Sequence, residues 1–434
     1  MTAVVAVCGT GCGKQHRAER PDWFTNEAYF EEKNGMYEEL PISPRNIVMV
    51  GDDYIDRGMW SEFYGDTTIK NRGITYDATE HVLYRIAPIA AKKPAKIFVS
   101  VGYNDLLHGT PAEEIVANIE KIFTTAKKAS PKTKLYWMNI VLLPLDSEQA
   151  EAGAKVNEGV KALSKKGVCQ YIDIDAVLRE GINSGEYSWD GGKYLNGAGY
   201  AALAKALESQ IGKPALNQPD DKDYAVEVSD YYKHRVSVFR SLPATKEKII
   251  MLGNSLNNNA PWEELFPMGY VINRGISGDI IDGVHQRIDE FVKEWPAKIF
   301  LLTGTNDLIN NPDVTVTEVW DHYESMLNDI QKLFPATMVY VQSILPLNPK
   351  SKFYPGFNEK AAEINKLLSA GQERYNYFYL DIASLLSDEN GDLRENCTTD
   401  GIHLSALGYY IWAGELAKGN RMMVEQTLFD KLTL

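Results

Sequence analysis

The sequence predicts an α/β protein made of two successive domains, each with a parallel β-sheet covered by helices on both faces. Two observations support this prediction. The chain contains a long internal repeat, and within each copy short apolar runs alternate with helical patterns. Strands that alternate with helices form parallel sheets, because each crossover helix returns the chain to the same end of the sheet.

The internal repeat aligns residues 29–106 with residues 231–308 without gaps, at a constant spacing of 202 positions. A repeat of this length exceeds the ~20–50 residues of a solenoid unit, so it indicates a duplicated domain. Shared segments include Asn71–Ile74 with Asn273–Ile276, Pro94–Phe98 with Pro296–Phe300, and Asn104–Leu106 with Asn306–Leu308.

The repeat divides the 434 residues into domains at 21–212 and 225–434. Residues 213–224, rich in Pro, Asp and Lys, are predicted to be a linker. Residues 1–20 resemble the end of a bacterial lipoprotein signal peptide with Cys12 as the lipid-accepting residue, although the charged segment that opens such peptides is absent. This predicts an exported protein, in the periplasm or on the outer membrane, with a lipid anchor at Cys12. The alternative is a disordered tail on a cytoplasmic protein.

Each copy opens with an amphipathic segment followed by a short apolar strand. The segments Tyr29–Leu40 and Tyr231–Leu242 are predicted helices, each stopped by a proline. Short apolar runs that end at a turn residue are typical of buried strands. The predicted strands are Ile47–Gly51, Ile97–Val101, Leu135–Ile140 and Tyr171–Ile174, then Ile249–Gly253, Tyr270–Asn273, Ile299–Leu302, Met338–Ile344 and Phe378–Ile382.

Between these strands, apolar residues recur at helical spacing. In the first copy the pattern covers Ile115 to Phe123, and in the second it covers Val319 to Phe334. A further set of apolar residues, from Val284 to Trp295, predicts one continuous helix in the second copy.

Composition excludes several classes of partner. The net charge is −14 and no run of Lys or Arg stands out, which argues against nucleic acid and anionic membrane surfaces. No stretch is long and apolar enough to span a bilayer. The Cys and His residues lack metal-site spacing, so neither a metal nor another cofactor is predicted.

Polar residues of the second copy follow the strands where ligands of parallel sheets bind, outside the carboxyl ends. Ser255 and Gly275 follow the first two predicted strands of this copy, and Asn306 follows the third. Asp400 and His403 lie in the loop before the last predicted helix. Five residues from four distant segments are therefore expected at one edge of the sheet.

These residue types suit acyl transfer. A serine hydroxyl such as that of Ser255 is a weak nucleophile until a base, here His403, takes its proton. Asp400 can hold the imidazole in the required tautomer and stabilise the imidazolium. The backbone N–H groups of Ser255 and Gly275 and the amide of Asn306 can donate to the oxyanion of the tetrahedral intermediate.

Four segments of the second copy resemble the sequence blocks of the SGNH (GDSL-type) hydrolases. They are Gly253–Leu256, Asn273–Gly275, Gly304–Asp307 and Asp400–His403. The resemblance matches Ser255, Gly275, Asn306 and His403 to the four residues of the family name, and Asp400 to the third triad member. It implies two tandem flavodoxin-like three-layer α/β/α domains and an ester hydrolase. Asn254 departs from the usual Gly-Asp-Ser.

The first copy resembles the same family without its reactive groups. Asp53 stands at the position of Ser255, while Gly73 and Asn104 remain. Asp190 is followed by Lys193 and Tyr194 instead of a histidine. A carboxylate beside the oxyanion donors would fill their site and repel developing negative charge, so this copy is predicted to be degenerate.

The sequence therefore predicts a serine esterase that removes small acyl groups, acetyl above all, from a small-molecule or glycan ester of carbohydrate type. Alternatives within the family are a lipase, a lysophospholipase and a thioesterase. No long apolar lid segment that would mark a lipase is visible. An alternative of another class is a non-enzymatic glycan-binding protein in which both copies use the family cleft.

Each candidate residue also has a purely structural interpretation. Ser255 could cap a helix, and Asp400 could be a turn residue. The matched arginines Arg85 and Arg287 are expected in salt bridges on helix surfaces, and not in contact with substrate. The convergence of several candidates in one copy, together with the loss of Ser and His from the other, favours the functional interpretation of the site.

Overall fold

The computed structural model describes residues 27–219, 224–244, 247–267, 271–291 and 296–418. The N-terminal segment 1–20 with Cys12, and part of the predicted linker, lie outside the described residues. Among the described helices, none has the length and apolar character needed to cross a membrane.

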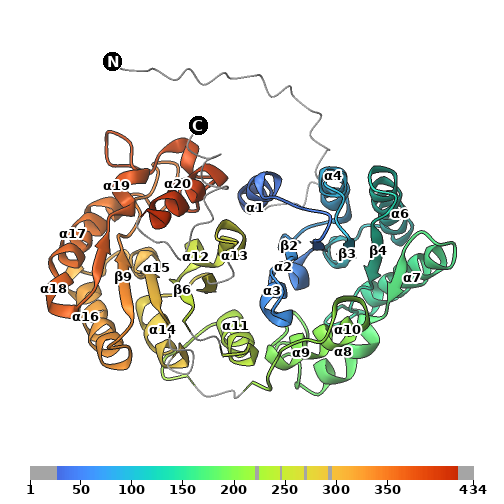
Figure 1. The fold of residues 1–434 in the computed structure, drawn as a ribbon, viewed down its shortest axis with the longest axis horizontal. Helices are drawn as coiled ribbons and strands as arrows, with labels where there is room; N and C mark the ends of the chain where they lie inside the picture. Colours follow the sequence, from blue (N-terminus) through green and yellow to red (C-terminus); the bar gives the residue numbers. More distant parts are fainter. Residues whose placement is uncertain (1–26, 220–223, 245–246, 268–270, 292–295, 419–434) are drawn as a thin grey trace.

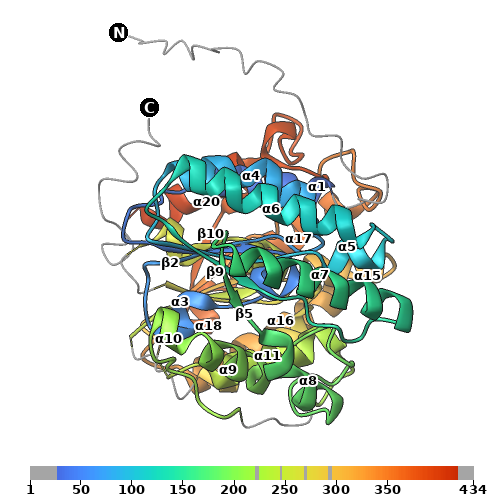
Figure 2. The same cartoon turned by 90° about the vertical axis from the view of Figure 1, so that its right-hand side faces the viewer.

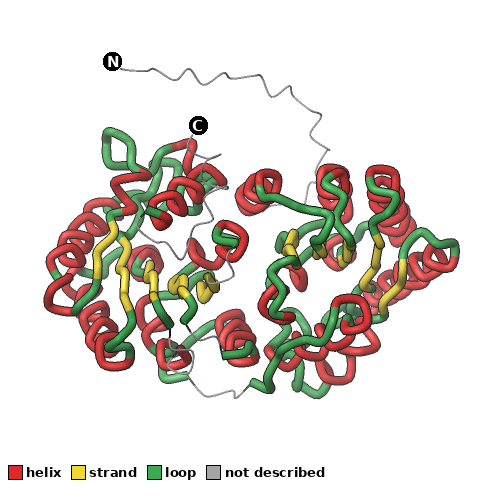
Figure 3. The backbone as a smooth tube through the Cα atoms, viewed as in Figure 1, coloured by secondary structure: helices red, strands yellow, loops and turns green. Residues whose placement is uncertain are grey.

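Each copy contains a five-stranded sheet in which all the paired strands are parallel (Figures 1 and 3). Both sheets have the same connectivity, in the order β2-β1-β3-β4-β5 and β7-β6-β8-β9-β10. The strands of the first sheet are β1 (Ile47–Gly51), β2 (Ile69–Gly73), β3 (Lys96–Ser100), β4 (Lys134–Met138) and β5 (Gln170–Ile172). Those of the second are β6 (Ile249–Gly253), β7 (Val271–Gly275), β8 (Lys298–Leu302), β9 (Met338–Gln342) and β10 (Phe378–Leu380).

Helices cover both faces of each sheet. Those of the first half are α1 (Glu27–Glu39), α2 (Asp53–Asp56), α3 (Trp60–Tyr64), α4 (Thr79–Ala91), α5 (Tyr103–Leu107), α6 (Ala112–Ala129), α7 (Ser147–Lys165), α8 (Ile174–Asn183), α9 (Gly197–Ala206) and α10 (Glu208–Ile211). Those of the second half are α11 (Asp230–Ser241), α12 (Ser255–Asn259), α13 (Trp262–Leu265), α14 (Ile281–His285), α15 (Thr305–Asn310), α16 (Val316–Leu333), α17 (Phe357–Ala370), α18 (Gln372–Tyr375), α19 (Ile382–Leu386) and α20 (Ala406–Ala417). Two 3₁₀ helices, η1 (Ile288–Phe291) and η2 (Glu395–Cys397), complete the second half.

Successive side chains of each buried strand point to opposite faces of the sheet, and each face is covered by a layer of helices. In β1, Val48 and Val50 pack on α4, α6 and α7, whereas Ile47 and Met49 pack on α8 and α9. Figure 2 shows α4 and α6 on one side of this sheet and α8 and α9 on the other. The second copy repeats this arrangement, with α14, α16 and α17 on one face and α19 and α20 on the other. The predicted three-layer α/β/α fold is therefore confirmed in both copies.

The two copies exchange their opening helices. Apolar residues of α1, including Phe30 and Met36, join the core formed by β6, β7 and α20 of the second copy. Residues of α11, including Val236 and Phe239, join the core of the first copy beside α9. Both helices lie in the middle of the molecule between the two sheets (Figure 1). Each copy thus completes one face of its sheet with a helix that the repeat assigns to the other.

Two reciprocal ion pairs join the copies. Arg72 donates two hydrogen bonds to Glu264, at 2.6 and 2.9 Å, and its repeat counterpart Arg274 donates two to Glu62, at 3.1 and 3.0 Å. Both arginines are 0 % exposed. Glu62 and Glu264 are themselves counterparts at the repeat spacing. The interface is therefore built as in a two-fold symmetric dimer, within one chain.

One predicted element differs from the structure. The helix expected from Val284 to Trp295 ends at His285 as α14, and a separate 3₁₀ helix, η1, follows. The matching segment of the first copy is the continuous helix α4. The end of the predicted helix, residues 292–295, lies outside the described residues.

Candidate active site

Short loops at the carboxyl ends of the strands hold the candidate residues of the second copy. Ser255 is the first residue of α12, directly after β6 and the capping residue Asn254, whose side chain accepts the Leu256 N–H at 3.1 Å. Asp400 and His403 lie between η2 and α20. The helix N-cap is therefore Asn254, and the Ser255 hydroxyl is left to face the site.

The structure brings Ser255, His403 and Asp400 into one hydrogen-bonded line. The distance between His403 Nε2 and Ser255 Oγ is 3.0 Å, and that between His403 Nδ1 and Asp400 Oδ2 is 2.7 Å. The His403 and Asp400 side chains are 28 % and 32 % exposed, so a substrate can reach them. This geometry allows a proton to move from the serine to the imidazole.

The loop around Asp400 and His403 holds itself in place. Asp400 Oδ1 accepts the backbone N–H groups of Ile402 and His403, at 2.8 and 2.7 Å. The carbonyl of His403 accepts a hydrogen bond from the Thr398 hydroxyl at 2.6 Å. One carboxylate thus orients both the backbone and the ring of the histidine.

The same contacts set the ionisation of the pair. Burial opposes ionisation of Asp400, but the hydrogen bonds and charge of His403 lower the pKa of Asp400 to about 2. Burial also disfavours the charged form of His403. The hydrogen bond to Asp400 and the charges of Glu32 and Asp400 outweigh it, so the pKa of His403 is raised. The imidazolium that forms when Ser255 loses its proton is therefore stabilised.

Asn306, in α15 after β8, provides an amide donor beside the end of the sheet. One N–H of its Nδ2 donates to the Asp279 carbonyl at 2.7 Å. The second N–H has no partner among the described residues, so it can donate to an oxyanion. The backbone N–H of Ser255 opens a helix, where the first N–H groups have no intrahelical acceptor.

The backbone N–H of Gly275 is already hydrogen-bonded, whereas an oxyanion donor is expected to be free. Its N–H donates to Asn273 Oδ1 at 2.8 Å, so this bond would have to be shared or broken to serve an oxyanion. A Cβ at Gly275 would come within 2.2 Å of the Asn258 backbone nitrogen. The glycine is therefore required by the close approach of β7 to α12. Its role as a donor stays a prediction.

The matched arginines are buried, contrary to the surface salt bridges expected from the sequence. Arg287 is 1 % exposed and donates to Asp279 at 2.8 and 3.1 Å and to the Gly253 carbonyl at 3.1 Å. Helical periodicity alone did not reveal this burial. Because the Asp279 carbonyl accepts the Asn306 amide, the arginine supports the loop that orients Asn306.

In the first copy, Asp53 occupies the place of the nucleophile and binds the retained amide. Its Oδ2 accepts hydrogen bonds from Asn104 Nδ2 and the Tyr76 N–H, both at 3.0 Å, and its Oδ1 pairs with Arg57 at 2.7 Å. Asn104 also donates to the Asp77 carbonyl at 3.1 Å. Both N–H groups of the Asn104 amide are thus engaged, and a carboxylate fills the oxyanion position.

The other first-copy candidates lie apart from any serine-type arrangement. Asp190 accepts hydrogen bonds from Ser188 and the Tyr194 N–H, at 2.7 and 3.1 Å. The N–H of Gly73 is bound by Asn71 at 2.8 Å, as in the second copy. The nearest imidazole to Asp190 is that of His234, which comes from the exchanged helix α11 at 3.8 Å.

A cavity of about 280 Å³ remains above the first copy's site, lined by Asp53, Asn104, Asp190 and Lys193 among others. Three tyrosines also line it: Tyr54, Tyr76 and Tyr103. The second copy has Leu256, Gly278 and Thr305 at these repeat positions. The sequence analysis did not identify these tyrosines, although comparing the copies position by position would have revealed them.

No set of three or more metal-ligating side chains lies together in the part of the chain that the structure describes.

Both copies match the model of one known protein family. A model of the GDSL-like Lipase/Acylhydrolase family matches residues 52–202 and again residues 250–411. The platelet-activating factor acetylhydrolase IB subunit alpha2 of Rattus norvegicus is 30 % identical over 193 residues, which span 42 % of this chain and 82 % of the relative.

Among solved structures, a GDSL-like lipase from Bacteroides thetaiotaomicron is similar with a TM-score of 0.39 and 21 % identity, over 43 % of this chain and 95 % of its own. A carbohydrate acetylesterase family member from Sinorhizobium meliloti has a TM-score of 0.34 and 14 % identity, over 41 % and 97 %. The two family matches together span most of the chain, one in each copy. The chain is therefore a tandem member of the GDSL-like lipase/acylhydrolase family, and an esterase.

Proposed function

We propose that the second copy hydrolyses small acyl esters, acetyl esters above all, with Ser255 as nucleophile, His403 as base and Asp400 as its partner. The observation that carries the proposal is the continuous line from Ser255 Oγ to His403 at 3.0 Å and on to Asp400 at 2.7 Å. The name of the rat relative, an acetylhydrolase, supports the choice of acyl group.

The proposed reaction uses this line of residues in two steps. His403 Nε2 takes the Ser255 proton while Oγ attacks the acyl carbonyl, and the Asn306 amide donates to the oxyanion. As the tetrahedral intermediate collapses, the imidazolium gives the proton to the departing alcohol and an acyl-enzyme remains. Water then attacks the acyl-enzyme while His403 takes a proton from it; as this second intermediate collapses, the imidazolium returns the proton to Ser255 Oγ and the carboxylic acid leaves.

The alcohol part of the substrate is proposed to be a carbohydrate. The partial exposure of His403 and Asp400 supports a bulky alcohol, since an open site does not need to engulf it. A phospholipid-type alcohol, suggested by the name of the relative, is the competing candidate.

The test is a series of 4-nitrophenyl esters from acetate to octanoate, followed by acetylated xylan and platelet-activating factor. Highest kcat/KM on acetate and release of acetate from the glycan would support the proposal. A preference for octanoate, or turnover of the phospholipid alone, would reject the carbohydrate assignment. Ser255→Ala should lower kcat by about 10⁴-fold or more at unchanged fold; retained activity would reject the nucleophile.

We also propose that the first copy binds a ligand without transforming it. The cavity of about 280 Å³ and its three tyrosines support this, because aromatic faces and a few polar groups are usual in small-molecule sites. Tyr76 is 48 % exposed and has a φ of 66°, a left-handed conformation that its counterpart Gly278 adopts without cost. A strained, exposed aromatic residue at the cavity favours contact with a ligand.

An uncharged sugar ring suits this cavity, since tyrosine faces can stack on it while Asp190 and Lys193 bond its hydroxyls. Calorimetric titration of xylohexaose and chitohexaose into the Ser255→Ala protein tests the idea. The Tyr76→Gly variant, which installs the residue of the second copy, should weaken binding. Equal sugar binding by the Ser255→Ala protein with and without Tyr76→Gly, or no binding by either protein, would reject a sugar site in the first copy.

A further inference from the structure

Helix α1 lies against the candidate active site of the other copy. Its apolar residues join the core that contains α12 and α20, the helices on either side of the Ser255–His403 contact. Two consecutive charged residues of α1, Glu32 and Lys33, are buried in the same region. The helix therefore brings two ionisable side chains to elements that carry the nucleophile and the base.

Glu32 is 0 % exposed and bridges these two elements. Its Oε1 accepts the Tyr409 hydroxyl of α20 at 2.9 Å and Asn259 Nδ2 of α12 at 3.1 Å, and its Oε2 lies 3.2 Å from the same nitrogen. The Tyr409 hydroxyl also lies 3.0 Å from the carbonyl of Leu256, the residue after Ser255. One carboxylate thus connects the nucleophile helix with the helix that follows the histidine.

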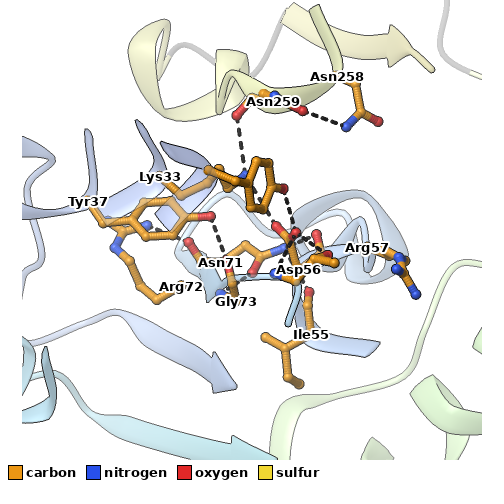
Figure 4. A network of polar contacts seen from close by, with 12 residues as sticks. Lys33, Tyr37, Ile55, Asp56, Arg57, Asn71, Arg72, Gly73, Asn258 and Asn259 are labelled. Atoms are coloured by element: carbon orange, nitrogen blue, oxygen red, sulfur yellow. Dashed lines mark hydrogen bonds and ion pairs between the residues drawn. The ribbon is translucent and has the colours of Figure 1, made fainter. Parts of the chain in front are cut away.

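Lys33 provides a second contact to α12. Its Nζ donates to the Asn259 carbonyl at 3.2 Å and pairs with Asp56 Oδ1 at 3.2 Å. Figure 4 shows the lysine between Asn259 of the second copy and Asp56 of the first. Helix α12 has only five residues, so Asn259 lies little more than one helical turn from Ser255. Small displacements of a nucleophile can be costly for the rate.

The repeat counterpart of Glu32 is His234 on α11. This imidazole accepts the Trp189 N–H at 3.1 Å and lies against the first copy's site. The exchange of helices is thus reciprocal, but at this matched position only the helix that faces Ser255 and His403 has a carboxylate. Core packing alone would not require this difference.

We infer that Glu32 is a positioning residue for hydrolysis at Ser255, supplied by the helix that opens the first copy. It holds α12 and α20 in register and places a negative charge near His403. This inference rests on the proposed ester hydrolysis in the second copy. It gives the degenerate half a defined part in the reaction.

The ionisation of Glu32 is coupled to that of His403. The titratable groups that act on or respond to Glu32 are Tyr29 and Lys33 on α1, Tyr409 on α20 and His403, whereas α12 offers the neutral amide of Asn259. Burial raises the pKa of Glu32 to about 7, against the opposing effects of His403 and its hydrogen-bond donors. The negative charge of Glu32 raises the pKa of His403. Removing the charge of Glu32 should therefore lower the pKa of His403.

The isosteric variant Glu32→Gln tests the inference in the full-length chain. The matched control is Glu38→Gln, on the exposed side of the same helix, where the carboxylate accepts only Asn34 Nδ2 at 2.8 Å among the described residues. We expect Glu32→Gln to lower kcat for 4-nitrophenyl acetate by about tenfold, with KM within about twofold, as for a misplaced nucleophile. The acid limb of the pH profile should move down by roughly 0.5–1 pH unit. Glu38→Gln should match the wild type in both respects.

NMR titration of the His403 ring gives a readout that does not depend on turnover. A lower pKa of His403 in Glu32→Gln supports the inference even if the chosen ester is a poor substrate. An unchanged kcat and an unchanged His403 titration would overturn it. If Glu32→Gln does not fold, Glu32→Asp withdraws the carboxylate from Tyr409 and Asn259, and full activity of that variant would equally overturn it. An inactive wild type with a normal His403 titration would instead count against the proposed substrate.

Discussion

The two copies provide a matched test of the oxyanion site. Asn306 and Asn104 occupy the same repeat position, each after a strand end and each donating to the carbonyl of a matched aspartate, Asp279 or Asp77. They differ in their second N–H, which is bound to Asp53 at Asn104 but has no partner among the described residues at Asn306. The perturbation is alanine at each position in turn.

The expected magnitude follows from this difference. Loss of one oxyanion donor lowers kcat by about 10²–10³-fold, or roughly 3–4 kcal/mol of transition-state stabilisation. We expect this loss for Asn306→Ala, with little change in KM, because the bond strengthens only as negative charge develops. Asn104→Ala removes a donor already bound to a carboxylate, in the other copy and far from Ser255 in sequence. It should leave kcat unchanged within error.

Steady-state kinetics with 4-nitrophenyl acetate on both variants decide the question, with circular dichroism melting curves to verify folding. Equal losses from the two substitutions would refute the division of labour, because they would mean that the first copy takes part in the chemistry. A rise in KM at unchanged kcat for Asn306→Ala would mean that this residue acts in substrate binding.

Further predictions concern the base, the degenerate copy and the interface. Protonated His403 cannot accept the serine proton, so kcat/KM should fall with decreasing pH, with a midpoint above the usual 6.5 because its pKa is raised; a midpoint below 6 in a pH–rate profile would contradict this. Asp53→Ser in the Ser255→Ala background should remain unlabelled by a serine-directed organophosphonate, since among the described residues no imidazole bonds to Asp53; mass-spectrometric labelling there would count against the argument. Glu264→Gln should cost about 3–5 kcal/mol by leaving a buried arginine unpaired, and Glu62→Gln less, because these glutamate side chains are 2 % and 15 % exposed. Urea unfolding of both variants measures the loss in free energy of unfolding, and a larger loss for Glu62→Gln than for Glu264→Gln would contradict the prediction.

Local patterns predicted nine of the ten described strands, all but β2 (Ile69–Gly73), together with the candidate residues at their carboxyl ends. Runs such as Ile249–Gly253 are short, apolar throughout and end at a turn residue, which favours buried strands, and in a parallel sheet the carboxyl ends of such strands lie at one edge. Ser255, Asp400 and His403 were therefore predictable as neighbours before their distances were known.

The destination of the amphipathic helices was not predictable in the same way. The pattern of α1 shows that one side must be buried, but a hydrophobic stripe fits either sheet equally well. The tertiary structure places α1 on the second copy and α11 on the first. For the same reason, the functional importance of Glu32 could not be read from its position in a helix.

The sequence by itself determined that this chain is a duplicated α/β esterase and which copy retains a serine, a histidine and an aspartate in the right order. These features depend on residue identity and on short-range periodicity. Only the tertiary structure decided that Arg287 is buried, that the Gly275 N–H is already bound, and that a carboxylate from before the first sheet lies near the histidine of the second. Such contacts depend on how distant segments pack, which no local pattern encodes.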